Sequence, residues 1–312
     1  MKKRFCKLIP AFTMLVLLFT SCAKEPTVSV IEATIDGYSV TFSVVVTDAD
    51  TYLWDFGDGS TSTEAAPVHA YVSSGDYTVS VTVTGKGGEA TATKAINILP
   101  SVTEMLSGGT TATNGKTWVL STGYVAGVNG GSVVDNAMFV MLPTVENVLT
   151  VIGLGYEYDN EYTFYADGKY VVDVKNELAV TAGIYGMVNG TTKDVGNEYN
   201  TLGIYAGSYV APASATWTLH EEDLVVKAVV NPVGTDVPVL TEDRTITSRK
   251  WVEISSDAFF GILDFPSTRK FIIKEITPEK MEVALFVCGY FPDQTAWNVP
   301  SYFYHLTYVP KN

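Results

Sequence analysis

Residues 77 to 84 carry the pattern that most restricts the fold of this chain. Tyr77, Val79, Val81 and Val83 alternate with threonine and serine at the positions between them. Side chains on a strand point alternately to its two faces, so this period of two predicts a strand with one buried face. Val, Thr, Tyr and Gly are abundant elsewhere, and no long stretch has helical apolar spacing. The sequence therefore predicts an all-β protein.

A longer motif surrounds this strand. The chain reads YLWDFGDGS at 52–60, PVHAY at 67–71 and GDYTVSVTV at 75–83. Trp54 is suited to fill the space between two packed sheets. The series closely resembles the PKD module, an immunoglobulin-like sandwich, over residues 27–98. The resemblance implies a spacer, or a module that contacts proteins or glycans, rather than an enzyme.

The acidic turn of this motif does not have the spacing of a calcium loop. With Gly59 as the loop glycine, Phe56 and Ala65 would stand where oxygen ligands are needed. Asp58-Gly59 is therefore interpreted as a turn. His69 has no His or Cys partner nearby, and we expect it to be a packed structural residue.

The N-terminus has the organisation of an export signal. Four basic residues within positions 2–7 precede an apolar run from Leu8 to Phe19, which is shorter than the roughly 20 residues that span a bilayer. The run ends in FTSC, which resembles the lipobox of bacterial lipoproteins. This resemblance implies a signal peptide over 1–21, lipid on Cys22, a tether over 22–26, and anchoring in the outer membrane at the cell surface.

Cysteine usage and charge limit the classes of partner. If Cys6 leaves with the signal and Cys22 carries lipid, Cys288 has no disulfide partner, and we expect it to be buried. Removing the four basic residues of the signal from the 20 Lys and Arg leaves 16, against 34 Asp and Glu, a formal net charge of −18. Without a basic block, a nucleic-acid partner is not expected.

A second domain is predicted after a linker. Residues 99–113 are rich in Thr and Gly and are interpreted as the linker. Residues 114–312 then form a larger β domain, either an antiparallel sandwich or jelly roll or, alternatively, a lipocalin-like barrel. Its candidate strands are 116–121, 137–142, 148–152, 161–165, 169–174, 216–219, 224–229, 250–254, 271–276, 281–287 and 301–309.

Three segments of this domain carry a looser resemblance. They read GKTWVL at 115–120, EYTFYADGKY at 161–170 and ITPEKMEVALFV at 276–287. They resemble exported domains of gut Bacteroidetes, both glycan-binding and lipocalin-like. Together with the lipobox and the PKD motif, this implies a surface lipoprotein of a polysaccharide-utilisation system, with an outer-membrane glycan importer as a possible partner.

The stretch GYEYDNEYTF at 155–164 predicts a hairpin and its register. With residues 166–168 as a three-residue loop that ends in glycine, Phe164 faces Tyr170 and Tyr162 faces Val172 on the core side. On the other side Glu161 faces Asp173, an unfavourable pair of like charges unless it is solvated or shares a cation.

Alternate carboxylates in this stretch leave three interpretations open. If the strand extends back, Glu157, Asp159 and Glu161 share one face. Glu157 and Glu161 then resemble the nucleophile and acid/base of laminarinase-type glucanases, although Asn160 is a poor core residue. Alternatively, Asp159, Glu161 and Asp173 bind a cation such as a structural Ca²⁺, and no other cofactor is expected. The third interpretation is a solvated strand face.

Aromatic residues supply the candidate sugar contacts. Trp118, Trp217 and Trp251 lie in strand-like runs, and we expect them in the core. Trp297 lies in a polar loop near Tyr290, where an exposed ring would be a binding site. Tyr156 and Tyr158 are further candidates.

Three hypotheses about function follow. The first is a non-catalytic surface lipoprotein that binds polysaccharide or oligosaccharide through its second domain. The second is a glycoside hydrolase that uses Glu157 and Glu161. The third is a structural or adhesion protein with protein partners. His220 and His305 have no ligand spacing around them, and the sequence lacks the HExxH and GxSxG motifs.

Overall fold

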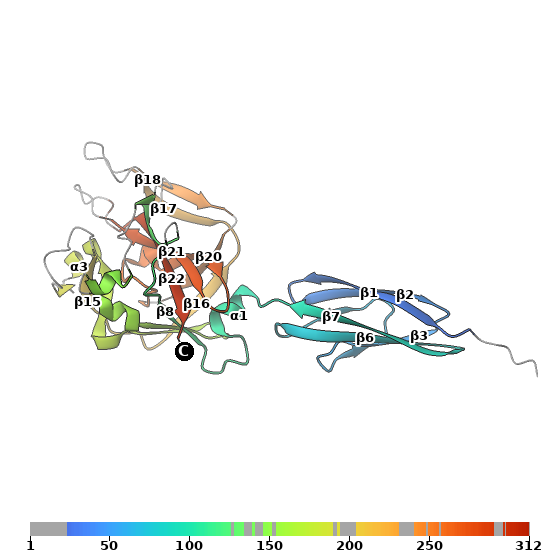
Figure 1. Ribbon diagram of the computed structural model, residues 1–312. Coiled ribbons are helices and arrows are strands. Elements are labelled where there is room, and N and C mark those ends of the chain that lie inside the picture. Colours follow the sequence, from blue (N-terminus) through green and yellow to red (C-terminus); the bar gives the residue numbers. More distant parts are fainter. Residues whose placement is uncertain are drawn as a thin grey trace, which may run out of the picture. The chain divides into compact units, whose positions relative to one another are not determined.

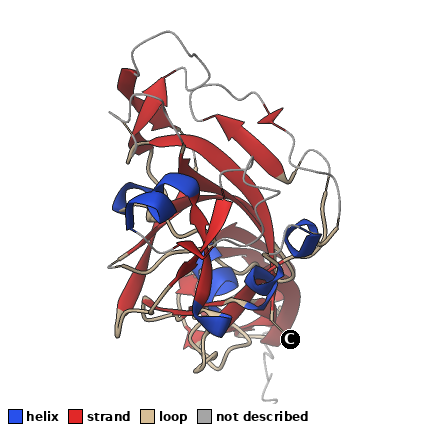
Figure 2. Cartoon of the chain, turned by 90° about the vertical axis from the view of Figure 1, so that its left-hand side faces the viewer, coloured by secondary structure: helices blue, strands red, loops and turns tan. Residues whose placement is uncertain are grey.

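The structure is a computed structural model that consists of two compact units, Met1–Leu99 and Pro100–Asn312. Strands dominate both units, and the helices are short (Figures 1 and 2). The predicted all-β class is therefore confirmed. The structure describes residues 24–125, 128–133, 139–140, 146–151, 154–189, 192–193, 204–230, 240–247, 249–255, 257–289, 296 and 298–311.

The first unit is a sandwich of two antiparallel sheets. One sheet has the order β1-β2-β5 and the other the order β4-β3-β6-β7. Their strands are β1 (Thr27–Asp36), β2 (Ser39–Thr47), β3 (Thr51–Asp55), β4 (Thr61–Ser62), β5 (Val68–Ala70), β6 (Gly75–Gly85) and β7 (Gly88–Ile98). This is the immunoglobulin-like architecture that the motif predicts.

The alternating pattern of residues 77–84 has the predicted effect. Val79, Val81 and Val83 on β6 are fully buried, and they pack in one core with Trp54 and Phe42. The indole Nε1 of Trp54 donates to the Glu64 carbonyl at 2.9 Å. The ring is therefore buried without leaving its polar atom unsatisfied.

The acidic turn and His69 are tied to each other in this unit. The Asp58 carboxylate accepts from the Ser60 amide at 2.9 Å, and its other oxygen lies 2.7 Å from Nε2 of His69. His69 also stacks on Phe56, with ring centroids 4.1 Å apart. The expected structural role of His69 is confirmed.

The second unit is built on a closed barrel. Among the described residues, eight strands that follow one another around the ring pair antiparallel, and the last pairs with the first. They are β8 (Lys116–Leu120), β11 (Glu161–Phe164), β12 (Lys169–Asp173), β16 (Ala215–His220), β19 (Lys250–Ile254), β20 (Lys270–Ile276), β21 (Met281–Cys288) and β22 (Pro300–Pro310). This is the up-and-down barrel alternative from the sequence.

The predicted hairpin lies in this ring with the expected register. β11 pairs with β12 so that Phe164 faces Tyr170, Tyr162 faces Val172 and Glu161 faces Asp173. The first four of these side chains are buried in the barrel core. The hairpin prediction is therefore confirmed.

Large aromatic side chains fill the barrel interior. Trp118 and Trp217 are buried there, as expected, and they join one cluster with Phe271. Phe259 and Phe260 enter the same cluster from the connection between β19 and β20. Because the interior is packed with side chains, this part of the barrel is a core and not a channel.

Further strands lie around the ring. β9 (Gly130–Val133) pairs with β22 and with β10 (Phe139–Val140), while β13 (Leu178–Ala182), β15 (Ile204–Ser208) and β14 (Thr192–Lys193) form a separate sheet. β17 (Leu224–Val230) and β18 (Leu240–Ile246) form a hairpin whose Leu224 and Val226 pack on Trp251 and Phe286. Trp251 is therefore buried, as expected, on the outside of the ring.

The short helices include two departures from the sequence predictions. Val148–Val151 forms α2 rather than the predicted strand at 148–152. The expected linker contains α1 (Val102–Ser107), which contacts β8, β11 and β20. Leu106 of α1 is fully buried, and its carbonyl accepts from Nε1 of Trp118 at 2.9 Å. Much of the 99–113 segment is thus part of the second unit.

Among the described residues, the remaining helices are α3 (Gly183–Asn189) and three 3-10 turns. These turns are η1 (Gly155–Asp159), η2 (Lys175–Glu177) and η4 (Pro266–Thr268). Cys288, the last residue of β21, is a free and buried thiol, as expected for a small apolar residue.

Candidate functional site

A cavity of about 80 Å³ lies in the second unit, beside the seam at which β8 and β22 close the ring. Most of its wall is apolar, with Leu120 from β8, Leu306 from β22 and Val180 from β13. Leu149 of α2 and Ile262, which follows the Phe259-Phe260 pair, complete these apolar contacts. Apolar walls with a few placed polar groups are typical of ligand pockets.

Glu157 is the one carboxylate in the described lining of the cavity. It lies on η1, and only 2% of its surface is exposed. Tyr162 donates its hydroxyl to Oε1 at 2.5 Å, and Asn160 donates its amide to Oε2 at 2.8 Å. The residue is thus held in a fixed orientation at the edge of the barrel core.

Burial changes the protonation of this residue. Desolvation raises the pKa of Glu157 from 4.5 to about 8, although hydrogen bonds from Tyr162, Asn160 and the Val180 backbone oppose the rise. Glu157 is therefore mainly a neutral carboxylic acid at pH 7. A neutral acid can donate a hydrogen bond as well as accept one.

Asn160 organises the backbone around Glu157. It is fully buried, and besides Glu157 it donates to the Leu178 carbonyl at 3.3 Å. Its own carbonyl accepts from the Lys175 amide at 2.8 Å. Asparagine is a poor core residue by type, but its burial is tolerated here because each of its polar atoms has a hydrogen-bond partner.

Tyrosines supply further polar groups of the cavity. Tyr308 is fully buried, Tyr124 is half-buried, and both line the cavity. Within the described part of the chain, neither of these two hydroxyls has a hydrogen-bond partner. Burial raises the pKa of Tyr308 well above its usual value, so its hydroxyl stays neutral. Both groups are available to a ligand that carries donors or acceptors.

Gly261 allows Tyr308 to occupy its position. The glycine has a φ of +74°, a conformation that other residues rarely adopt. A Cβ atom at this residue would overlap the Tyr308 hydroxyl and Cδ1 of Leu285. The turn after Phe259-Phe260 therefore requires glycine for both its backbone and its close approach to β22.

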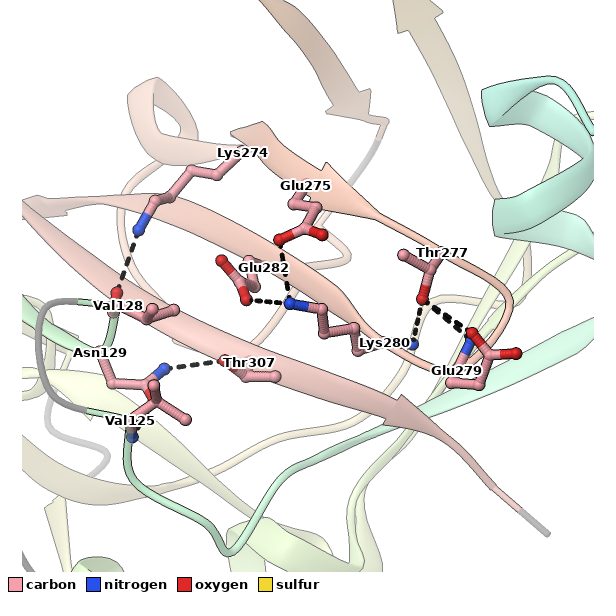
Figure 3. A network of polar contacts seen from close by, with 10 residues as sticks. All are labelled: Val125, Val128, Asn129, Lys274, Glu275, Thr277, Glu279, Lys280, Glu282 and Thr307. Atoms are coloured by element: carbon pink, nitrogen blue, oxygen red, sulfur yellow. Dashed lines mark hydrogen bonds and ion pairs between the residues drawn. The ribbon is translucent and has the colours of Figure 1, made fainter.

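One wall of the cavity is formed by the segment around Tyr124, which is tied to the barrel through Val128 and Asn129. Asn129 accepts from the Val125 amide at 2.8 Å and donates to the Thr307 hydroxyl at 2.9 Å (Figure 3). Lys274 of β20 donates to the Val128 carbonyl at 3.0 Å. These bonds fix the segment that carries Tyr124 against β22, so the wall is pre-formed.

The three carboxylates at alternate positions do not share a face. η1 occupies Gly155–Asp159, so the strand begins only at Glu161. Glu157 points into the unit while Asp159 is exposed. The assumption of a continuous strand back to Glu157 is therefore wrong, and with it the side-by-side arrangement of Glu157 and Glu161 that a hydrolase would need.

The opposed pair Glu161 and Asp173 is neutralised by lysines. Lys175 forms ion pairs with both carboxylates, at 3.0 Å to Glu161, and Lys311 lies 2.5 Å from the same Glu161 oxygen. Burial raises the pKa of Glu161, but the hydrogen bonds from Lys311 and Lys175 outweigh it and hold this pKa below its usual value. Two cations of the chain itself thus stand where a bound cation was hypothesised.

Metal binding has no further support in the described ranges. Among those residues, no group of three or more His, Cys, Asp or Glu side chains could hold a metal ion. The helices in the same ranges are also too short or too polar to cross a membrane.

The predicted sugar contacts do not all lie at the cavity. Tyr158 lines the cavity, and its hydroxyl accepts from the Leu149 amide at 3.2 Å. Tyr156, next to Glu157, packs instead with Leu154, Val180 and Ala206. The lipidation residue Cys22 and the predicted contacts Tyr290 and Trp297 lie outside the described residues.

Sequence reasoning did not single out Tyr308, Tyr124 or the Phe259-Phe260-Gly261 turn. Tyr308 lies in a predicted strand, but its place on the cavity depends on the pairing of β22 with β8. A signal was present in the turn, since the connection between β19 and β20 contains the apolar run from Ala258 to Leu263, interrupted only by Gly261.

Comparison with known proteins identifies the first unit. Residues 24–99 match the family model of the PKD domain, which confirms the predicted module. A segment of 63 residues is 44% identical to the pre-pro-metalloprotease PrtV of Vibrio cholerae serotype O1 and covers 19% of this chain and 7% of that protein. A segment of 68 residues is 50% identical to a microbial collagenase of Vibrio alginolyticus and covers 20% and 8%. The chain thus spans under a tenth of either relative.

One solved structure aligns with both units. It is a carbohydrate-binding module of the β-sandwich superfamily, described as promiscuous in specificity, and 93% of this chain aligns with 92% of it at 12% identity. The TM-score is 0.25, too low to carry an argument about the fold of the barrel.

Proposed function

We propose that this protein binds carbohydrate without catalysis, through the cavity of its second unit, with the PKD unit as a spacer. The observation that carries the proposal is the cavity beside Glu157, whose lining tyrosines Tyr124 and Tyr308 have buried hydroxyls with no partner among the described residues. Sugars present C–H faces that pack on apolar and aromatic walls, and hydroxyl groups that need such partners. A pre-formed wall lowers the entropic cost of binding.

The same geometry argues against the hydrolase alternative. Glycoside hydrolysis needs two carboxyl groups on either side of the scissile bond. Glu157 is the single carboxylate in the described lining, and Glu161 is bound to Lys175 and Lys311 instead. The relatives that are proteases match over segments of 63 and 68 residues, which cover 7% and 8% of their own length, so their activities are not proposed for this chain.

Localisation is part of the proposal. The lipobox-like FTSC before residue 23 supports lipid on Cys22, anchoring in the outer membrane of a Bacteroidetes-type cell and exposure at the cell surface. An outer-membrane glycan importer is the partner that would accept the bound glycan. Labelling cells with an alkyne fatty acid should mark the wild-type chain and leave Cys22→Ala unmarked. Equal labelling of the two would refute lipidation at this residue.

Calorimetry of the purified protein with a panel of polysaccharides and oligosaccharides tests the binding function. We expect binding without release of reducing ends. Tyr308→Phe should weaken binding by about two- to tenfold, because each lost hydrogen bond contributes roughly 0.5–1.5 kcal/mol. Tyr302→Phe is the matched control, since Tyr302 lies on the same strand but not on the cavity. Sugar release from any substrate, or equal affinities for both variants, would contradict the proposal.

A further inference from the structure

The cavity is closed at its inner side. Tyr308, which lines the cavity, belongs to the buried cluster of the barrel core and packs against Phe260 with ring centroids 4.4 Å apart. The ring of paired strands beside the cavity is complete within the described part of the chain. A glycan chain therefore cannot pass from the cavity through the core of the barrel.

The volume of the cavity limits what can enter. An engineered cavity of about 150 Å³ in another protein admits one benzene molecule. The cavity here, at about 80 Å³, is roughly half that size. A whole pyranose ring does not fit within it, whereas a small substituent of a sugar does.

The chemistry of the wall selects the kind of substituent. Leu120, Leu149, Val180, Ile262 and Leu306 present methyl and methylene groups, which favour an apolar group over a hydroxymethyl or a charge. Glu157 adds one carboxyl group, neutral at pH 7, that can exchange a hydrogen bond with an adjoining amide or hydroxyl. A second hydrogen-bonding group near the apolar wall is the Tyr308 hydroxyl.

We infer that the barrel binds the terminal sugar of a glycan, and that a small methyl-bearing substituent of this sugar enters the cavity. An acetamido group and the C6 methyl group of a 6-deoxy sugar both have this chemistry. The ring of the sugar then lies at the mouth, beside Tyr124 and Tyr158, and the rest of the chain extends into solvent. The inference rests on the proposed function, because it names the ligand class of the same site.

Two series of probes test the inference with the full chain. The first compares sugars that differ in the substituent: glucose with N-acetylglucosamine, and L-galactose with L-fucose. Within at least one pair, we expect the methyl-bearing sugar to bind about fourfold more tightly, from the burial of one methyl group. A difference in affinity within the first pair identifies an acetamido group as the substituent, and a difference within the second pair identifies a 6-deoxy methyl group.

The second series lengthens the ligand. Oligomers of the preferred sugar, from one to six residues, should bind with affinities within about twofold of each other, since only the terminal residue makes contact. Affinity that rises with each added residue would overturn the inference while leaving carbohydrate binding intact. Equal binding within both sugar pairs would overturn it as well. Failure to bind any carbohydrate would instead refute the proposed function itself.

Filling the cavity gives an independent test. Leu149→Phe should reduce the affinity for the preferred sugar at least tenfold and abolish its advantage over the unsubstituted sugar. Val180→Ile adds a single methylene and should do the same to a smaller extent, which keeps the test valid if the larger variant does not fold. Val225→Phe, at an exposed position of β17, is the control. Full selectivity in a folded Val180→Ile variant would contradict insertion into this cavity.

Discussion

Replacing Glu157 with Gln should make the stability of the barrel less dependent on pH between about 5 and 8, with Asp264 accounting for the dependence that remains. Glutamine has nearly the same shape as glutamic acid. It can accept from Asn160 with its oxygen and donate to the Tyr162 hydroxyl with its nitrogen, so the two hydrogen bonds at 2.8 and 2.5 Å keep partners. The variant therefore removes the titratable carboxyl group and leaves the packing around residue 157 unchanged.

The direction and size of the pH dependence of the free energy of unfolding follow from the pKa of Glu157. Because the pKa of Glu157 is raised from 4.5 to about 8, the folded state holds a proton that the unfolded state releases above pH 4.5. This contribution is fully present below pH 4.5 and is lost as the pH rises to about 8. At 1.36 kcal/mol per pH unit, the full difference is roughly 5 kcal/mol. Asp264, whose pKa burial raises to about 7, adds a loss of the same sign.

Urea unfolding at pH 5, 6, 7 and 8 measures the effect. The free energy of unfolding of the wild-type barrel should fall more steeply with pH than that of Glu157→Gln, by up to about 1.4 kcal/mol per pH unit. The two proteins should be nearly equal at pH 5 and differ most at pH 8. Asp159→Asn, an exposed neighbour on η1, should retain the wild-type slope. Parallel pH profiles for wild type and Glu157→Gln would refute the buried, neutral carboxyl group.

Three further substitutions test the packing of each unit by urea unfolding. Leu106→Ala should lower the free energy of unfolding of the second unit by about 2–5 kcal/mol, since it empties a fully buried site; an unchanged transition would mean that α1 does not pack on the barrel. Asn160→Ala should cost about 2–4 kcal/mol, because it strands the buried groups that Asn160 bonds; a loss below about 1 kcal/mol would contradict that network. Tyr71→Phe removes the 3.0 Å bond from the Tyr71 hydroxyl to the Phe56 carbonyl and should destabilise only the first unit, by about 1 kcal/mol. A shift in the second transition instead would show that the units do not unfold separately.

Local patterns in the sequence predict local structure well in this chain. The register of β11 with β12 follows from the position of Gly168 in a three-residue loop and from the apolar alternation at Tyr162 and Phe164. The first unit follows from a motif of turns and alternating residues. In both cases the pairing partners are close in sequence, so short-range rules are sufficient.

The candidate site required information that no local pattern contains. Glu157 has the same alternate spacing as Asp159 and Glu161, yet it is buried because Tyr162, Asn160 and Val180 surround it. Val180 belongs to another sheet, and Tyr308 reaches the cavity from the last strand of the barrel. The period of two correctly describes β11, but it says nothing about where β11 begins. Whether residues 155–159 form a 3-10 turn or continue the strand is decided by their tertiary contacts.

The seam between β8 and β22 has a consequence for the order of folding. Leu120 pairs with Tyr308 across nearly the full length of the second unit, so this contact has one of the largest sequence separations in the barrel and should form late. The cavity lies on the seam, with Leu120 on one side and Leu306 on the other. A ligand that contacts both strands would bind only the closed ring. It would therefore stabilise the closed state and lower the rate at which the barrel opens.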